Sequence, residues 1–166
     1  IHEPWGIAQS CDETMPAENN ELLKHEIDKG STVYNIKFDT ATLNAVDVAD
    51  AEKPGDEGVN VTTADDMNVL LNGLDFEKYP VMMYTGATAV NLLGLTSAVL
   101  KAQGKDVKCL RGVIGADPIG ELIRKGSSKA SLDALYDDMA ESIKWAKANA
   151  PELRTVFVRS EVFTDG

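Results

Sequence analysis

The sequence has few of the residues from which metal and redox sites are usually built. Its 166 residues include only two cysteines and two histidines. Cys11 and Cys109 lie far apart and match no metal-ligand spacing, so we expect two reduced thiols. His2 lies near the first residue, and His25 falls in a polar helical pattern. Because no cluster of cysteine and histidine is available for zinc or haem iron, we expect no metal site.

Positive charge and long apolar runs are also scarce. Lysine and arginine number 16 against 27 acidic residues, which gives a net charge of -11. Nucleic-acid binding normally needs a basic face, so we expect no nucleic-acid partner. No apolar run approaches the ~20 residues that cross a bilayer, and no signal-peptide pattern is present. We therefore expect no membrane association and a cytoplasmic location, or the mitochondrial matrix if the source is eukaryotic. The first residue is Ile rather than Met, which suggests an internal piece of a longer chain.

The remaining composition is typical of a folded α/β protein. Apolar residues make up 43% of the chain and charged residues 26%, which indicates a packed core. Short runs rich in β-forming residues alternate with helical patterns, at residues 33–38, 81–86, 110–115 and 155–160. This alternation predicts parallel strands joined by right-handed crossovers. Residues 1–30 are expected to form an extended arm and a helix, and residues 31–166 to form the four strand–helix units.

Local signals place several helices and one long loop. Thr63 and Asp66 form a capping-box pattern, and Ser131 is placed to cap a later helix. Residues 87–103 are apolar nearly all round, which predicts a helix buried on both sides. Residues 39–62 make a long strand-to-helix connection. Such a loop is either functional, at the carboxyl ends of the strands, or a solvated excursion.

Three local patterns suggest chemistry, and each also has a simple structural explanation. The glycine-rich residues 112–122 join a strand to a helix, as phosphate-binding loops do, but they match neither GxGxxG nor a P-loop. Asp117 would repel phosphate there, so we expect it to cap the helix. Residues 10–12 include possible nucleophiles without a histidine to activate them. The basic residues 124–125 could bind an anion, or they could lie at the C-terminal end of a helix, where cations are favourable.

An ordered series of segments resembles the methylmalonyl-CoA mutase family, and its small-subunit type in particular. The segments are PWGIAQSCDE, VYNIKFDTAT, DFEKYPVMMYTGATAVNLL, LRGVIGADPIGELIRKG and SLDALYDDMAESIKWAKANAPELRTVFV. The resemblance implies the first half of a (β/α)8 TIM barrel. It also implies an enzyme that interconverts methylmalonyl-CoA and succinyl-CoA by a radical rearrangement that uses adenosylcobalamin. In heterodimeric members the large subunit is catalytic, and the small subunit supplies a partner surface.

Three positions depart from the pattern of the catalytic members. The resemblance puts Ser10 where they have a tyrosine, Lys125 where they have a substrate-gripping arginine, and Val162 where they have an active-site histidine. Lysine lacks the bidentate grip of arginine on a carboxylate, and valine donates no hydrogen bond. We therefore expect no catalytic residue in this chain. Phe38 and Asp39 match a family Phe-Asp pair and are the candidates for cofactor contact, although a structural role is sufficient for them. The Asp-x-His-x-x-Gly motif of cobalamin-binding domains is absent, so we expect no adenosylcobalamin bound to this chain.

Three interpretations of function remain open. The first is a non-catalytic partner of a large catalytic mutase subunit. The second is a catalytically competent acyl-CoA mutase component that uses different residues. The third is an unrelated α/β protein with a polar small-molecule pocket near Asp39, Tyr84 and Asp117.

Open strand edges generate the first testable prediction. Four strands do not close an eight-stranded barrel, which leaves edges at residues 33–38 and 155–160. Because open edges tend to pair, we predict that the chain associates with itself or with neighbouring chains. Sedimentation velocity should show species heavier than the 17.9 kDa monomer. A monodisperse monomer would contradict this prediction.

Overall fold

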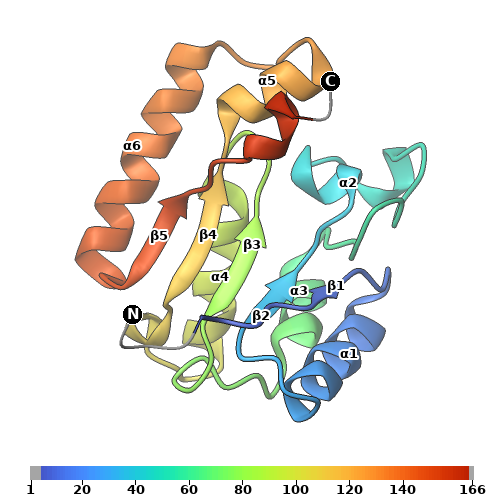
Figure 1. Ribbon diagram of the computed structural model, residues 1–166, viewed down its shortest axis with the longest axis vertical. Helices are drawn as coiled ribbons and strands as arrows, with labels where there is room; N and C mark the ends of the chain where they lie inside the picture. Colours follow the sequence, from blue (N-terminus) through green and yellow to red (C-terminus); the bar gives the residue numbers. More distant parts are fainter. Residues whose placement is uncertain (1–4, 165–166) are drawn as a thin grey trace. The chain divides into compact units, whose positions relative to one another are not determined.

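The computed structural model describes residues 5–164, which form a parallel α/β fold (Figure 1). Its five-stranded sheet follows the chain order β1-β2-β3-β4-β5. The strands are β1 (Ser10–Cys11), β2 (Tyr34–Ile36), β3 (Val81–Tyr84), β4 (Gly112–Ala116) and β5 (Leu153–Val156). The α-helices are α1 (Pro16–Asp28), α2 (Thr40–Leu43), α3 (Ala64–Leu71), α4 (Val90–Ala102), α5 (Pro118–Lys125) and α6 (Leu132–Asn149). Short 3-10 turns are η1 (Val48–Asp50), η2 (Val107–Cys109) and η3 (Ser160–Phe163). The predicted α/β class is confirmed.

The chain divides into two compact units, Ile1–Met83 and Tyr84–Gly166. None of the helices within residues 5–164 is both long and apolar enough to cross a membrane.

The first unit contains a strand that the sequence did not predict. β1 pairs in parallel with β2, with Ser10 opposite Asn35 and Cys11 opposite Ile36. The expectation of four strands with an open edge at residues 33–38 was therefore wrong, because the arm before α1 covers that edge. The carbonyl of Ile7 also accepts hydrogen bonds from the amides of Thr32 and Val33. Two residues are too few to show a periodic pattern, so this strand is recognisable only from its pairing.

The core of the first unit follows the predicted helical pattern. Thr63 and Asp66 form the expected capping box at the start of α3. Met67, Leu70 and Leu71 of this helical face are fully buried. Leu74, which was predicted on the same face, is also buried but lies beyond the end of α3 at Leu71. Buried Asn20 of α1 donates from Nδ2 to the carbonyls of Leu70, at 2.8 Å, and Asn72, at 2.9 Å. These bonds satisfy carbonyls at the end of α3 and fix α1 against it.

The connection between β2 and α3 folds back on the end of β2. Phe38 forms an isolated parallel bridge with Val59, and the Val59 amide donates to the Lys37 carbonyl at 2.8 Å. Gly58 is buried in this contact, so the backbone of the loop lies directly against the backbone of Lys37 and Phe38, just after β2. The long loop is therefore anchored to the first unit and is not a loose excursion.

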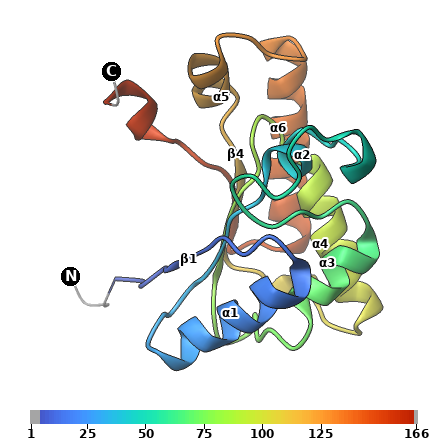
Figure 2. The same ribbon diagram turned by 90° about the vertical axis from the view of Figure 1, so that its right-hand side faces the viewer.

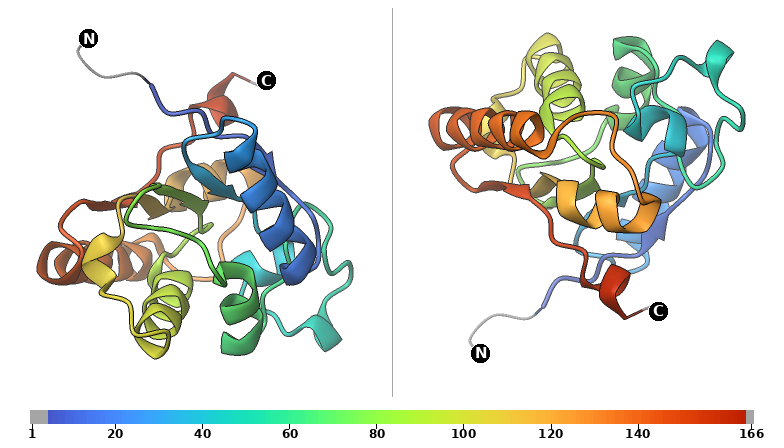
Figure 3. Two further views of the ribbon diagram at one scale, coloured as in Figure 1. Left: turned by 90° about the horizontal axis from the view of Figure 1, so that it is seen from below. Right: turned by 90° about the horizontal axis from the view of Figure 1, so that it is seen from above.

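The second unit places α4 and α6 on the same face of β4 and β5 (Figures 2 and 3). β4 and β5 pair in parallel, with Gly112 opposite Leu153. Ser131 caps α6 as predicted, by accepting a hydrogen bond from the Ala134 amide at 3.2 Å. The expectation that the helix now seen as α4 would be buried on both sides was wrong. Gly94 and Ala98 are exposed, since such small residues lose little by facing water.

Gly58 provides a test of the close contact between the loop and β2. A Cβ atom at this position would lie 2.6 Å from the carbonyl carbon of Lys37, closer than real Cβ contacts allow. We expect Gly58→Ala to lower the free energy of unfolding by about 1–3 kcal/mol, because the backbone must shift. In the control Gly94→Ala, the new Cβ meets no atom within 4 Å. That variant should be stabilised by up to about 1 kcal/mol. Urea denaturation measures both changes, and equal midpoints for the two variants would contradict the contact.

Candidate functional site

In the second unit, chemically active side chains gather where the last three strands end. Tyr84 is the final residue of β3, Asp117 follows β4 and Arg159 follows β5. Backbone hydrogen bonds hold these ends together: the Asp117 amide donates to the Gly86 carbonyl at 2.9 Å, and the Phe157 amide to the Ala116 carbonyl at 3.0 Å. The carboxyl ends of parallel strands are the usual place for sites in α/β proteins.

Asp117 is buried and uses both of its carboxylate oxygens within the protein. Oδ1 accepts from the Gly120 amide at 2.8 Å, which is the predicted cap of α5. Oδ2 accepts from the Arg159 amide at 2.8 Å. One carboxylate thus fixes the start of α5 and the chain after β5, which is a structural role.

Glu121 is the centre of the cluster, although sequence reasoning did not identify it. It lies one turn after Asp117 and is only 4% exposed. The Tyr84 hydroxyl donates to Oε1 at 2.7 Å, Arg124 reaches both oxygens at 3.0 and 3.3 Å, and Lys125 Nζ lies 2.5 Å from Oε2. The spacing of Glu121 from Arg124 and Lys125 is that of helix ion pairs, a signal visible in the sequence. Tyr84 is remote in sequence and could not have been placed there without the fold.

The cluster changes the acidity of its members. Burial acts to raise the pKa of Glu121, but hydrogen bonds from Lys125, Tyr84 and Arg124 outweigh burial and lower it. Burial and the adjacent Glu121 carboxylate both raise the pKa of Tyr84. At neutral pH the arrangement is therefore a glutamate anion held by a neutral phenol and two cations.

Phe157 and Arg159 pack against the ring of Tyr84. The Phe157 ring meets the Tyr84 ring edge-on at a centroid distance of 5.6 Å. The guanidinium of Arg159 lies 4.7 Å from the Tyr84 ring centroid and also pairs with Glu161. Arg159 is thus held over the ring by a carboxylate and by a cation–π contact.

The three positions that depart from the catalytic pattern lie in different places. Lys125 belongs to the Glu121 cluster. Val162 lies half-buried in η3, which contacts α5. Ser10 lies in β1 of the first unit and is exposed.

Phe38 and Asp39, the candidates for cofactor contact, organise the loop of the first unit. Phe38 is buried. Asp39 is fully buried: Oδ1 accepts from the Thr42 amide at 2.8 Å, and Oδ2 accepts from the Gly55 amide and from Asn60 Nδ2, both at 2.7 Å. Their observed contacts are therefore those of a loop anchor.

A hollow of about 540 Å³ adjoins this loop, beside Gly55 and Asn60. Its carboxylates, Asp47 and Asp66, accept from backbone amides at the starts of η1 and α3. Within residues 5–164, no three His, Cys, Asp or Glu side chains come together in a way that could hold a metal ion.

Comparison with known proteins identifies related sequences. The methylmalonyl-CoA mutase family model matches residues 1–166. The chain is 24% identical to the methylmalonyl-CoA mutase of Escherichia coli K12 over 159 residues, which are 94% of this chain and 22% of that protein. It is 30% identical to the ethylmalonyl-CoA mutase of Methylorubrum extorquens over 129 residues, 75% of this chain and 19% of that protein. Identity to the mitochondrial methylmalonyl-CoA mutase of Mus musculus is 22%, over 95% of this chain and 21% of that protein. The chain thus spans about one fifth of these curated relatives.

The lowered pKa of Glu121 generates a prediction about pH. A carboxylate whose folded pKa is depressed stabilises the protein above its unfolded pKa, and this contribution is lost as pH falls through the folded pKa. We expect Glu121→Gln to lower the free energy of unfolding at pH 7, on the order of 1–3 kcal/mol. The difference from the unmodified protein should shrink below pH 4.5, the ordinary pKa of glutamate.

Chemical denaturation across this pH range provides the measurement. The matched control is Glu141→Gln, which removes an exposed carboxylate whose partner is Lys144, both 70% exposed. Exposed pairs of this kind contribute little. A Glu121→Gln deficit that is independent of pH would contradict the charge pairing.

Proposed function

Because the chain belongs to the methylmalonyl-CoA mutase family, we propose that it is a non-catalytic scaffold part of an acyl-CoA mutase of that family. Its partner in this proposal is a large catalytic subunit that interconverts methylmalonyl-CoA and succinyl-CoA with adenosylcobalamin. In this proposal the chain is part of a small, non-catalytic subunit of the family.

The pairing of Lys125 with Glu121 is the observation that supports the proposal. In the family resemblance, Lys125 takes the position of the arginine that grips the substrate. Its ammonium lies 2.5 Å from Glu121, and Arg124 donates to the same buried carboxylate. A substrate carboxylate would have to displace Glu121 and leave a buried charge without partners, which is strongly unfavourable. In this proposal Arg124 and Lys125 therefore stabilise the folded chain and do not bind a substrate.

Val162 and Ser10, the other two positions that differ from the catalytic members, also support a non-catalytic role. Val162 has no polar atom on its side chain, so it can neither donate a proton nor hydrogen-bond to a thioester carbonyl. Ser10 is short and lies exposed at the edge strand β1. Neither side chain replaces the chemistry of the histidine or tyrosine that the catalytic members carry.

The described residues do not fit adenosylcobalamin, the cofactor that the family implies. His25, the histidine among residues 5–164, lies exposed in the last turn of α1. Asp39 already accepts three internal hydrogen bonds, and Phe38 is buried, with its backbone in the bridge to Val59. We therefore assign no cofactor contact to this chain and propose that the catalytic subunit holds the corrin. The family match does not favour the interpretation as an unrelated small-molecule protein.

Turnover by the isolated chain tests the proposal. Incubated with methylmalonyl-CoA and adenosylcobalamin, the chain should form no succinyl-CoA above a protein-free blank. Lys125→Arg should stay equally inactive, because Glu121 would hold the new guanidinium and positions 10 and 162 are unchanged. Mixed with the catalytic subunit, the chain should sediment as part of a heavier complex. Succinyl-CoA formation by the chain alone would overturn the proposal in favour of a catalytically competent component.

A further inference from the structure

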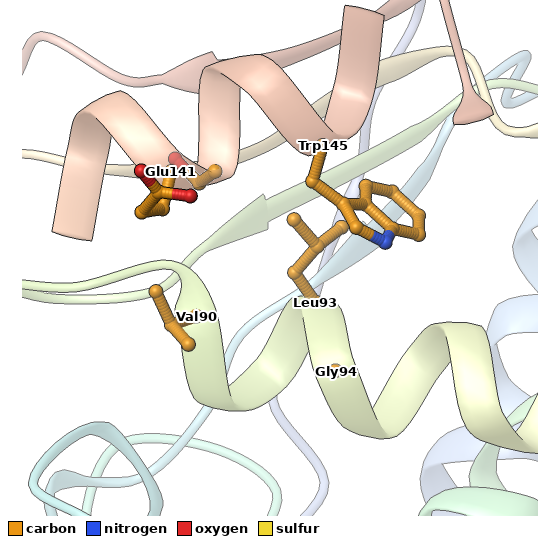
Figure 4. Close-up of a pocket in the computed structure, with 6 residues that line it drawn as sticks. Val90, Leu93, Gly94, Glu141 and Trp145 are labelled. Carbon is orange, nitrogen blue, oxygen red and sulfur yellow. The ribbon is translucent and has the colours of Figure 1, made fainter. Parts of the chain in front are cut away.

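A pocket outside the Glu121 cluster lies between α4 and α6 of the second unit. It has a volume of about 260 Å³ and is lined by Val90, Leu93, Gly94, Glu141, Ser142 and Trp145. Figure 4 shows the Trp145 indole reaching from α6 towards Leu93 of α4. Gly94 lies on the same stretch of α4, so its missing side chain leaves one wall of the pocket bare (Figure 4).

Gly94 is not required by the packing of the chain itself. It lies in the middle of α4, where glycine is about 1 kcal/mol less favourable than alanine. A Cβ atom at this position would meet no atom within 4 Å, so no neighbouring backbone needs the space. The glycine thus leaves this part of the pocket wall without a side chain, at a cost in helix stability. This combination points to an occupant that comes from outside the chain.

The size and walls of the pocket limit what can enter. Its volume is below the roughly 300–1,000 Å³ of cofactor- and drug-sized sites, so it suits one long side chain. Val90, Leu93 and Trp145 make the walls largely apolar. The Ser142 hydroxyl already donates to the Met139 carbonyl at 2.8 Å, within its own helix.

The negative charge of Glu141 at the rim of the pocket favours a positively charged occupant. Glu141 is the charged residue of the lining, and its pair with Lys144 is 70% exposed on both sides and therefore weak. Asp137 and Asp138 lie about one turn before Glu141 on α6, and Asp138 accepts a hydrogen bond from the Thr88 hydroxyl at 3.0 Å. An indole face beside a carboxylate favours a guanidinium, which is planar, stacks on aromatic rings and pairs with carboxylates.

We propose that the α4–α6 pocket receives an arginine side chain from a partner polypeptide. The aliphatic stem lies against Val90 and Leu93, and the guanidinium lies between Trp145 and Glu141. The proposal rests on the proposed function for the existence of a partner, and it adds the place and the chemistry of one contact.

Fluorescence of Trp145 provides the test. The full chain carries two tryptophans, and Trp5 is 86% exposed, so Trp5→Phe leaves Trp145 as the single reporter. The probe is N-acetyl-arginine amide, whose blocked ends imitate a polypeptide. N-acetyl-citrulline amide has the same shape without the charge. At constant ionic strength, the arginine probe should give a saturable change, and the citrulline probe should bind at least tenfold more weakly.

Three variants of this chain locate the binding. Gly94→Leu fills the pocket from the helix and should abolish the response. Glu141→Gln should weaken arginine binding about fivefold and leave the citrulline response unchanged. Ala140→Leu, on an exposed position of α6 outside the lining, is the matched control and should bind as the parent does. Circular dichroism verifies that each variant is folded.

Several results would overturn the proposal: no saturable change in the parent, equal binding of the two probes, or arginine binding that survives Gly94→Leu. These failures leave the proposed function intact, because the probes report on the pocket and not on turnover. Conversely, turnover by the isolated chain would overturn the proposed function without altering the probe titrations.

Discussion

A carboxylate that is buried away from water needs hydrogen-bond donors from the protein. Two such buried carboxylates, those of Glu121 and Asp117, organise the second unit. Glu121 takes its donors from Tyr84 of β3 and from two cations of its own helix. Asp117, one turn earlier, joins the first turn of α5 to the backbone after β5. The helix is therefore tied to the ends of β3, β4 and β5 by two buried acids. In this arrangement the side chains of Tyr84, Asp117 and Glu121 find their hydrogen-bond partners within the second unit.

The same requirement shapes the first unit. Asp39 is fully buried and takes its three hydrogen bonds from Thr42, Gly55 and Asn60, across the long connection after β2. These bonds explain why a loop rich in acidic residues and glycine folds back against β2. In both units, groups that a catalytic site could have used are engaged in holding the chain together. A scaffold role in a mutase assembly is consistent with that use.

Short-range signals in the sequence predicted much of the fold. The capping residues Thr63 and Ser131 and the alternation of strands and helices reflect interactions within a few residues, and the structure confirms them. β1 was missed because a two-residue strand has no periodicity, and α4 was misjudged because small residues can be exposed at little cost. In the site, Lys125 was singled out by family resemblance, whereas the contact of Tyr84 with Glu121 spans 37 residues and depends on the fold.

The proposed scaffold role depends on one physical claim. The Glu121 carboxylate pairs with Arg124 and Lys125, so these cations are not free to bind the carboxylate of a substrate. The carbon-13 NMR signal of the Glu121 side-chain carboxyl, followed at pH 7 while methylmalonate is added, measures this directly. If Tyr84, Arg124 and Lys125 remain bound to Glu121, the signal will not change with methylmalonate concentration. A saturable shift of that signal would show that the added carboxylate takes over these donors, and it would contradict the claim.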